Sequence, residues 1–137
     1  MTAAFFSHWL ARLGHRKSIE NREVFRQVND AVLKRARRAI RLRQFDLAIA
    51  FIQECGDSAA HDAACLNVLG LIAEARDDWQ EARRCWSRAL QVDPSYTPAY
   101  DNLRRWMELF HWGKTSVPVT FGDEPKSLLA LRNRNHQ

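Results

Sequence analysis

Four basic side chains share one face of a predicted helix near the start of the chain. Lys34, Arg37, Arg38 and Arg41 follow the spacing i, i+3, i+4 and i+7, which places them in a single stripe, the basic stripe. Such a stripe attracts an acidic protein surface, lipid headgroups or nucleic acid. No aromatic stacking set or sequence-reading motif accompanies it. A solvated basic face stays open as the alternative, and nucleic-acid binding is the less expected use.

The other chemically capable residues do not form a catalytic arrangement. The five histidines are scattered, without the H-E-x-x-H or paired Cys/His spacing of a metal site, and no Gly-rich phosphate loop is present. His61 and Cys65 form an i, i+4 pair, which is too little for a nucleophilic site. We therefore predict a protein that is not an enzyme, with no catalytic residues, no metal and no cofactor.

The cysteines and the lack of long apolar runs predict the cellular location of the protein. Cys55, Cys65 and Cys85 are odd in number and fit neither a disulfide framework nor a zinc site, so they are expected to be small buried side chains. No apolar run approaches the roughly 18 residues that cross a bilayer, and no secretory signal is expected. The prediction is a cytoplasmic protein, either free or peripheral at the cytoplasmic face of a membrane.

The composition is that of one soluble globular domain. The chain has 137 residues, 46% of them hydrophobic and 27% charged. Its net charge of +5 is unevenly spread, with a basic front up to Arg43, an acidic middle and a mildly basic end. A basic front beside an acidic middle favours contacts with charged partners.

The most regular stretch of the chain runs over residues 63–96. Two runs of apolar and small residues at helical spacing flank the polar pair Asp77-Asp78, and Pro94 closes the stretch because a proline ring cannot continue a helix. The small residues let two helices approach closely, so we predict an antiparallel helix pair. The periodic positions are Leu66, Leu69, Gly70, Ala73, Ala82, Trp86 and Ala89.

This stretch resembles the tetratricopeptide repeat (TPR), whose 34-residue pattern is W-x₂-L-G-x₂-Y, then A-x₃-F, then P. Leu69-Gly70, the pair Ala82 and Trp86, and Pro94 match the pattern, while Leu66 and Ala73 replace its aromatic residues. The resemblance implies an all-α fold: a TPR-like helical repeat (α-solenoid) of antiparallel helix pairs.

Shifting this unit by 34 residues in either direction finds degenerate copies. The earlier copy has helices expected from about Ile19 to Leu42 and from Phe45 to Cys55. The later copy is expected to be capped by Thr97 and to end at Trp112, without a second helix because Pro118 lies in an extended stretch. A last short helix is expected over residues 124–132. The predicted parts are an N-terminal amphipathic helix at 1–17, a repeat domain at 18–113 and a C-terminal extension at 114–137.

The resemblance also implies where a partner binds. In the family, the first helices of successive repeats line a concave groove that holds an extended peptide or a partner helix. Some members clamp a terminal carboxylate there. Arg37, Asn67, Asn102 and Arg105 offer comparable chemistry, but Leu33 and Val68 stand where more polar residues would be expected. The candidate groove residues are Arg37, Arg41, Asn67, Leu71, Glu74, Asp101 and Arg105.

A second candidate docking element precedes the repeats. The predicted N-terminal helix has a basic polar side and an apolar side, which suits a membrane surface, a partner protein or the end of the repeat array. Its apolar side consists of Phe5, Phe6, Trp9, Leu10 and Leu13.

These observations favour a non-catalytic adaptor or accessory subunit of a larger multi-subunit assembly, with a protein partner in the groove. A membrane-peripheral protein and a secretion-type chaperone that use the N-terminal helix remain the alternatives. Nucleic-acid binding through the basic stripe is less expected.

Overall fold

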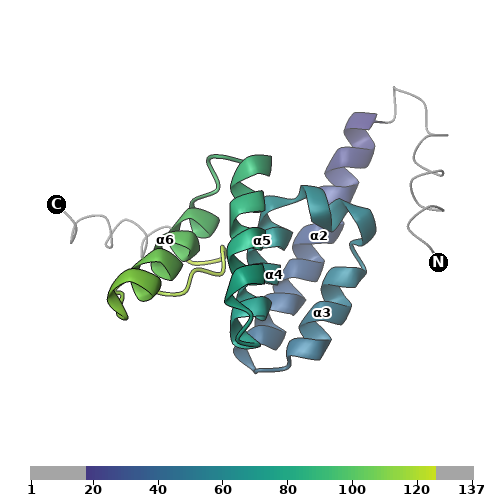
Figure 1. Cartoon of the computed structure of the whole chain (residues 1–137). Helices are drawn as coiled ribbons and strands as arrows, with labels where there is room; N and C mark the ends of the chain where they lie inside the picture. Colours follow the sequence, from purple (N-terminus) through teal and green to yellow (C-terminus); the bar gives the residue numbers. More distant parts are fainter. Residues whose placement is uncertain (1–17, 126–137) are drawn as a thin grey trace.

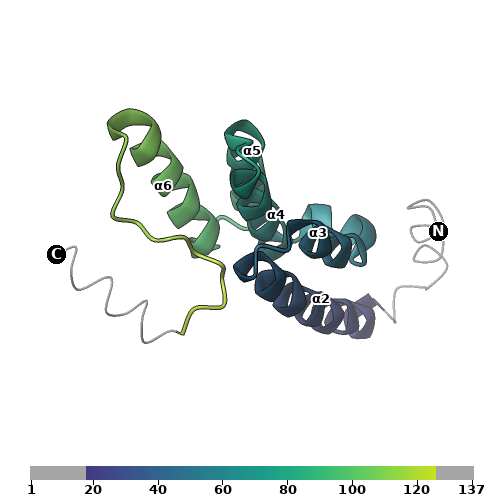
Figure 2. The same ribbon diagram turned by 90° about the horizontal axis from the view of Figure 1, so that it is seen from below.

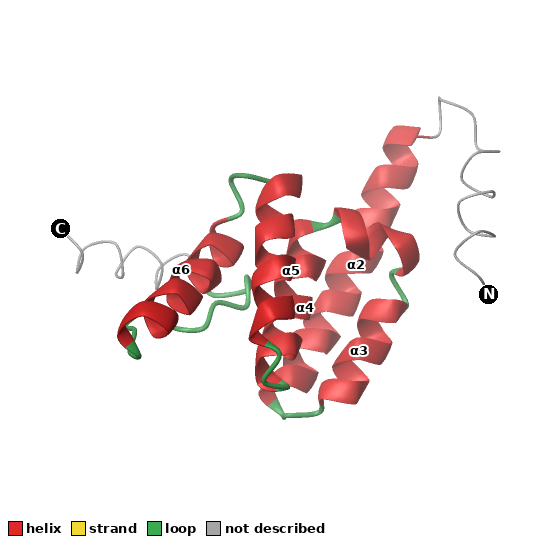
Figure 3. Cartoon of the chain, viewed as in Figure 1, coloured by secondary structure: helices red, strands yellow, loops and turns green. Residues whose placement is uncertain are grey.

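The described part of the chain is an array of helices. The computed structural model describes residues 18–125, which contain helices, turns and extended segments but no β-strand (Figure 3). Successive helices follow one another across the molecule (Figure 1). They are α2 (Ser18–Arg41), α3 (Phe45–Gln53), the 3₁₀ helix η2 (Gly56–His61), α4 (Ala63–Ala75), α5 (Trp79–Val92) and α6 (Thr97–Trp112).

The helices form the predicted antiparallel pairs. α2 packs on α3 and α4 packs on α5, while α6 packs against α5 and α4. α2 and α4 also contact each other, so the pairs stack into one array (Figures 1 and 2). The all-α helical-repeat architecture is therefore confirmed.

The turns within the first two pairs have the same geometry 34 residues apart. The Gln44 amide donates to the Ala39 carbonyl at 2.8 Å, and the Asp78 amide donates to Ala73 at 2.9 Å. Each turn contains one residue in the left-handed region, Arg43 with φ 59° and Asp77 with φ 64°. This bond pattern satisfies carbonyls at a helix C-terminus. The first pair is thus a structural copy of the second, although its sequence matches the repeat poorly.

The core of the central pair is built around one indole. Trp86 is fully buried, and a Cβ atom added at Gly70 would lie 2.4 Å from its Nε1 atom. The absence of a side chain at Gly70 therefore lets α4 and α5 approach around the ring. The equivalent position in the first pair, Ala36, is also fully buried and faces a smaller apolar residue, Ile52.

Three local predictions need correction. α3 ends at Gln53 rather than Cys55, and a 3₁₀ turn follows, in which the Ser58 hydroxyl donates to the Cys55 carbonyl at 2.6 Å. Thr97 begins α6 instead of capping it: the N-cap is Tyr96, and the Thr97 hydroxyl donates to the Ser95 carbonyl at 3.4 Å. Glu124 is not helical, and the rest of the helix expected over 124–132 lies outside the described residues apart from Pro125.

Candidate partner-binding groove

An extended segment of the chain crosses the face formed by α2, α4 and α6. α6 ends at Gly113, which adopts a left-handed conformation with φ 67°. Residues 114–125 then turn back and reach α2 (Figure 2). Side chains from all three helices contact this stretch, so the three helices share one face. We call that face the concave groove and residues 117–124 the groove segment.

Two buried asparagines hold the middle of the groove segment. The Asn102 side chain donates to the Thr120 carbonyl at 2.7 Å and accepts from the Thr120 amide at 3.1 Å. Asn67 donates to the carbonyls of Thr120 and Phe121 at 3.0 and 3.3 Å. Both asparagine side chains are fully buried. Because these bonds reach only backbone atoms, they do not depend on the side chains of the groove segment.

The asparagines are themselves fixed by the repeat. Asn102 donates to the Asn67 side-chain oxygen at 2.8 Å, and the Trp86 indole donates to the Asn67 backbone carbonyl at 3.3 Å. The two carboxamides therefore orient each other, and the Trp86 bond fixes the backbone that carries one of them. The core tryptophan of the central pair thus supports the groove directly.

Two arginines of α2 hold the end of the groove segment. The Arg37 Nε atom donates to the Phe121 carbonyl at 3.0 Å. Arg41 makes two bonds to the Asp123 carboxylate, at 2.8 and 2.6 Å, and its guanidinium lies 4.1 Å from the centre of the Phe121 ring. Hydrogen bonding to Arg41 lowers the pKa of Asp123, and the same bond raises the pKa of Arg41. The basic end of α2 therefore fits an aromatic residue and an acidic residue two positions after it.

Gly122, which lies between Phe121 and Asp123, is in tight contact with the helices' side of the groove. Gly122 has φ 95°, and a Cβ atom added there would lie 2.4 Å from the Tyr96 hydroxyl oxygen and 3.0 Å from an Arg37 nitrogen. The Tyr96 hydroxyl is buried, and that burial raises the pKa of the group. Position 122 thus requires glycine for both its backbone conformation and its space.

The remaining predicted groove residues line the same face. Leu71 borders an apolar hollow of about 280 Å³ that Val119 and Phe121 also line. Glu74 lines that hollow and forms a two-bond ion pair with Arg105, which is only 4% exposed. Asp101 is half-buried on α6. The structure therefore gathers Arg37, Arg41, Asn67 and Leu71 directly around the groove segment, with the Glu74–Arg105 pair beside it.

The basic stripe does not present four available cations. Arg37 is half-buried against the Phe121 carbonyl, and Arg41 is bound to Asp123, so their donors are directed at the groove segment. Lys34 and Arg38 remain exposed on α2. While the groove segment is in place, this face therefore does not present four basic side chains to a phosphate.

Sequence patterns did not reveal that the chain fills its own groove. The prediction of an extended stretch at Val117–Phe121 was correct, but its destination was not foreseen. The acids Asp123 and Glu124 after an apolar stretch were the available signal, because they complement the basic end of α2. The predicted docking side chains Phe5, Phe6, Trp9, Leu10 and Leu13 lie outside the described residues.

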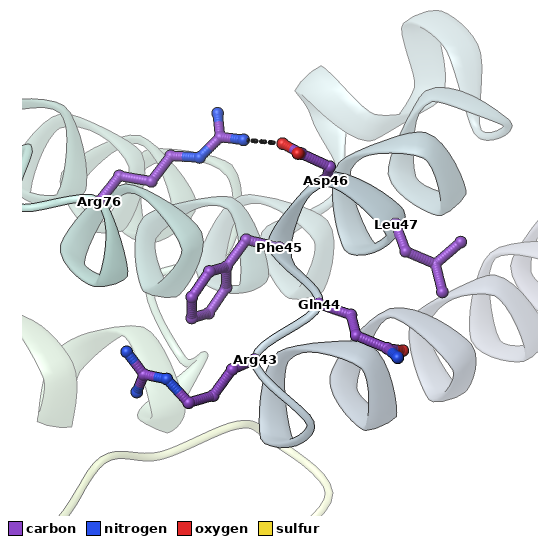
Figure 4. A pocket seen from close by; sticks show the side chains of 6 residues that line it. All are labelled: Arg43, Gln44, Phe45, Asp46, Leu47 and Arg76. Atoms are coloured by element: carbon purple, nitrogen blue, oxygen red, sulfur yellow. Dashed lines mark hydrogen bonds and ion pairs between the residues drawn. The ribbon is translucent and has the colours of Figure 1, made fainter.

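Two other hollows open on the surface. One, of about 380 Å³, lies between α5 and α6 and is lined by Trp79, Trp106, Leu109 and Phe110. The other lies at the α2–α3 turn, where Arg76, which caps the end of α4, pairs with the Asp46 carboxylate above the Phe45 ring (Figure 4). Arg43 stacks on that ring at 5.4 Å. Because Arg76 is already paired, this second hollow offers no convergent set of cations.

The described residues give little material for metal or thiol chemistry. No group of three or more His, Cys, Asp or Glu side chains among them is arranged to hold a metal ion. Cys55, Cys65 and Cys85 are free and buried. Hydrogen bonding with the Cys55 thiol, and burial, raise the pKa of Cys65. Among the helices that the structure describes, none is long and apolar enough to cross a membrane.

Comparison with known proteins identifies the central pair. The family model of the tetratricopeptide repeat matches residues 63–96, which are α4 and α5 with their flanking turns. Neither curated proteins nor solved structures gave a match to the chain. The matched unit has the antiparallel pair, the Gly70–Trp86 contact and the closing Pro94 of such a repeat. Residues 63–96 are therefore a tetratricopeptide repeat, set in a TPR-like helical-repeat fold.

Proposed function

We propose that the protein is a non-catalytic adaptor or accessory subunit that binds an extended segment of a partner protein in the concave groove. The tetratricopeptide repeat suggests protein–protein interaction in general. The observation that supports the finer proposal is the pair Asn67 and Asn102, whose buried carboxamides are directed at the backbone of an extended peptide. A groove already built to hold polypeptide is suited to a peptide partner.

The charge of the groove indicates the kind of partner. Arg37 and Arg41 stand at the end of α2, while Arg105 is neutralised by Glu74. The acid that neutralises Arg41 is Asp123 of the groove segment itself, so an acidic residue suits this end of the groove in a partner that takes the segment's place. The free, buried cysteines favour a cytoplasmic setting for this function.

The test is a binding experiment with matched variants of the full chain. The immobilised wild-type protein is compared with Asn102→Ala, which removes a backbone contact in the groove, and with Arg84→Ala, which changes an exposed residue of α5. We expect one partner protein to be retained by the wild type and by Arg84→Ala, and to be lost from Asn102→Ala. Circular dichroism checks that both variants are folded.

A partner retained equally by all three proteins would contradict the groove as its binding site. The same experiment with Phe5, Phe6 and Trp9 changed together to serine tests the N-terminal segment. Loss of binding there, with Asn102→Ala unaffected, would assign docking to that segment instead.

A further inference from the structure

We propose that the groove segment is an internal stand-in for the partner, and that the partner displaces it with a segment carrying an aromatic residue, a glycine and an acid in succession. This inference rests on the proposed function. It adds which residues of the partner the groove selects, and it names the groove segment as the competitor for the site.

The groove segment is held as a separate peptide would be held. Within the described residues, the bonds between it and the helices run through the side chains of Arg37, Arg41, Asn67 and Asn102. None of them joins its backbone to the backbone of a helix. Each helix therefore keeps its own hydrogen bonds when the segment leaves, so displacement does not require the repeat to unfold.

The first position recognised is the one occupied by Thr120. Asn102 contacts both the amide and the carbonyl of this residue, so a proline, which lacks the amide hydrogen, is excluded there. Thr120 is only 1% exposed, and its hydroxyl donates to the Pro118 carbonyl of the same segment. This buried position therefore selects a residue of modest size. The described helices select its side chain by space alone, because the Thr120 hydroxyl bonds within the segment.

The next two positions are selected more sharply. The Phe121 ring lies under the Arg41 guanidinium and lines the apolar hollow with Leu71, an arrangement that favours an aromatic ring. At Gly122 any side chain would meet the Tyr96 hydroxyl. The groove therefore requires an aromatic residue followed by glycine.

The last position is selected by charge. The Asp123 carboxylate receives two hydrogen bonds from Arg41, in the paired geometry that a planar guanidinium offers to a carboxylate. A neutral or basic residue would leave Arg41 without this partner. The groove segment thus defines the pattern aromatic–glycine–acid.

Tethering gives the internal segment a large advantage. A segment joined by a short linker has an effective concentration on the order of millimolar, so a partner's apparent affinity is reduced by the fraction of molecules whose groove is open. Weakening the internal segment, without changing the groove, should therefore strengthen binding of a peptide added from outside.

The experiment uses a fluorescent synthetic peptide with the sequence of residues 116–125 and the full chain, followed by fluorescence polarisation. The variant Phe121→Ala/Asp123→Ala weakens only the internal segment. We expect it to bind the peptide about tenfold or more tightly than the wild type does, because it loses an aromatic contact and an ion pair. The control Asp57→Ala, an exposed acid on η2, should bind as the wild type does.

Peptide variants test the pattern without any effect on folding of the protein. Peptides in which Phe121 or Gly122 is replaced by alanine should bind the weakened variant at least about tenfold less tightly than the parent peptide, and the Asp123→Ala peptide about two- to fivefold less tightly, because the Arg41–Asp123 pair is partly exposed. Equal binding of the Gly122→Ala peptide would overturn the proposed pattern. Amide exchange of Thr120 in the wild type should accelerate when the parent peptide is added, because the internal segment leaves.

The outcomes separate the two proposals. A peptide that binds neither protein contradicts the groove as a peptide site, and the proposed function fails with it. Equal affinity for wild type and the weakened variant, lost in Asn102→Ala, overturns internal competition while the groove function stands. A wild-type protein that forms dimers with exchanged segments, seen by light scattering, would also overturn the internal stand-in.

Discussion

The Trp86 indole lies directly over Gly70, so closely that a Cβ atom there would approach its Nε1 atom to 2.4 Å. The same Nε1 atom donates to the Asn67 carbonyl, one turn earlier on α4. One contact in the core of the tetratricopeptide repeat therefore also sets the backbone that carries a groove residue. Changes at this contact should affect both stability and binding.

Gly70→Ala tests this contact. Alanine favours a helix over glycine by about 0.5–1 kcal/mol, but here its methyl group must displace the Trp86 ring. Overpacking of this kind costs about 1–3 kcal/mol, so we expect a net loss of stability. Urea unfolding measures it, with Gln80→Ala on the exposed side of α5 as a control that should change by less than about 0.5 kcal/mol. A variant more stable than the wild type would contradict the packing described.

Arg105→Ala should destabilise the protein strongly. It removes the buried partner of Glu74 and leaves that carboxylate uncompensated, which costs about 3–5 kcal/mol. The double variant Arg105→Met/Glu74→Leu removes both charges and should recover most of the loss. The free energy of urea unfolding distinguishes the two, and Arg104→Ala, which changes an exposed arginine of the same helix, is the control.

The Arg41–Asp123 pair predicts a specific dependence on pH. Because the folded state lowers the pKa of Asp123, the pair stabilises the protein fully above the ordinary carboxyl pKa, near 3.9, and loses its effect as pH falls through the lower folded value. The two side chains are 44% and 34% exposed, so the contribution is about 0.5–1 kcal/mol.

The measurement is the difference in unfolding free energy between the wild type and Asp123→Asn. We expect it to be constant from neutral pH to about pH 5 and to shrink below about pH 4. A difference that already falls between about pH 7 and pH 5 would rule out this pair as its source.

The three thiols are buried, so they should be inaccessible to a reagent in the folded protein, including Cys55, whose pKa is lowered by hydrogen bonding with Cys65. Burial, together with the nearby Glu81 carboxylate, raises the pKa of Cys85 to about 12. At about pH 8 only about one molecule in ten thousand then carries its thiolate, which is the reactive form. A chromogenic disulfide reagent should therefore modify no thiol in the native protein and Cys55, Cys65 and Cys85 after denaturation. Rapid modification of Cys85 in the native state would contradict its placement.

The sequence was most informative about helix ends, where a particular residue type has a particular structural role. Asp62 and Asp78 directly precede α4 and α5, where aspartate is a preferred N-cap, and each accepts a bond from the amide three residues later, at 3.1 Å. Gly113 follows Trp112, the expected end of the helix, and it ends α6 in the left-handed conformation that glycine favours. Local hydrogen bonding decides these features, so a local pattern is enough to predict them.

Long-range placement was harder to predict. The extended character of Val117–Phe121 follows from Pro118, but its contact with α2 spans most of the chain, since Arg37 and Phe121 are separated by 84 positions. Arg37 and Arg41 look like surface cations in a helical stripe. Only the fold shows that both are directed at an acidic stretch from the other end of the chain.

That connection also bears on the mechanics of the array. In a stacked array each repeat normally contacts only its neighbours. The array can therefore bend, and its terminal repeats can unfold one at a time. Here the groove segment follows α6 and is bonded to α2, so it ties the last helix of the described residues to the first. We expect this strap to limit bending of the solenoid and to couple fraying at one end of the array to fraying at the other. Release of the strap would let the array open as well as expose its groove.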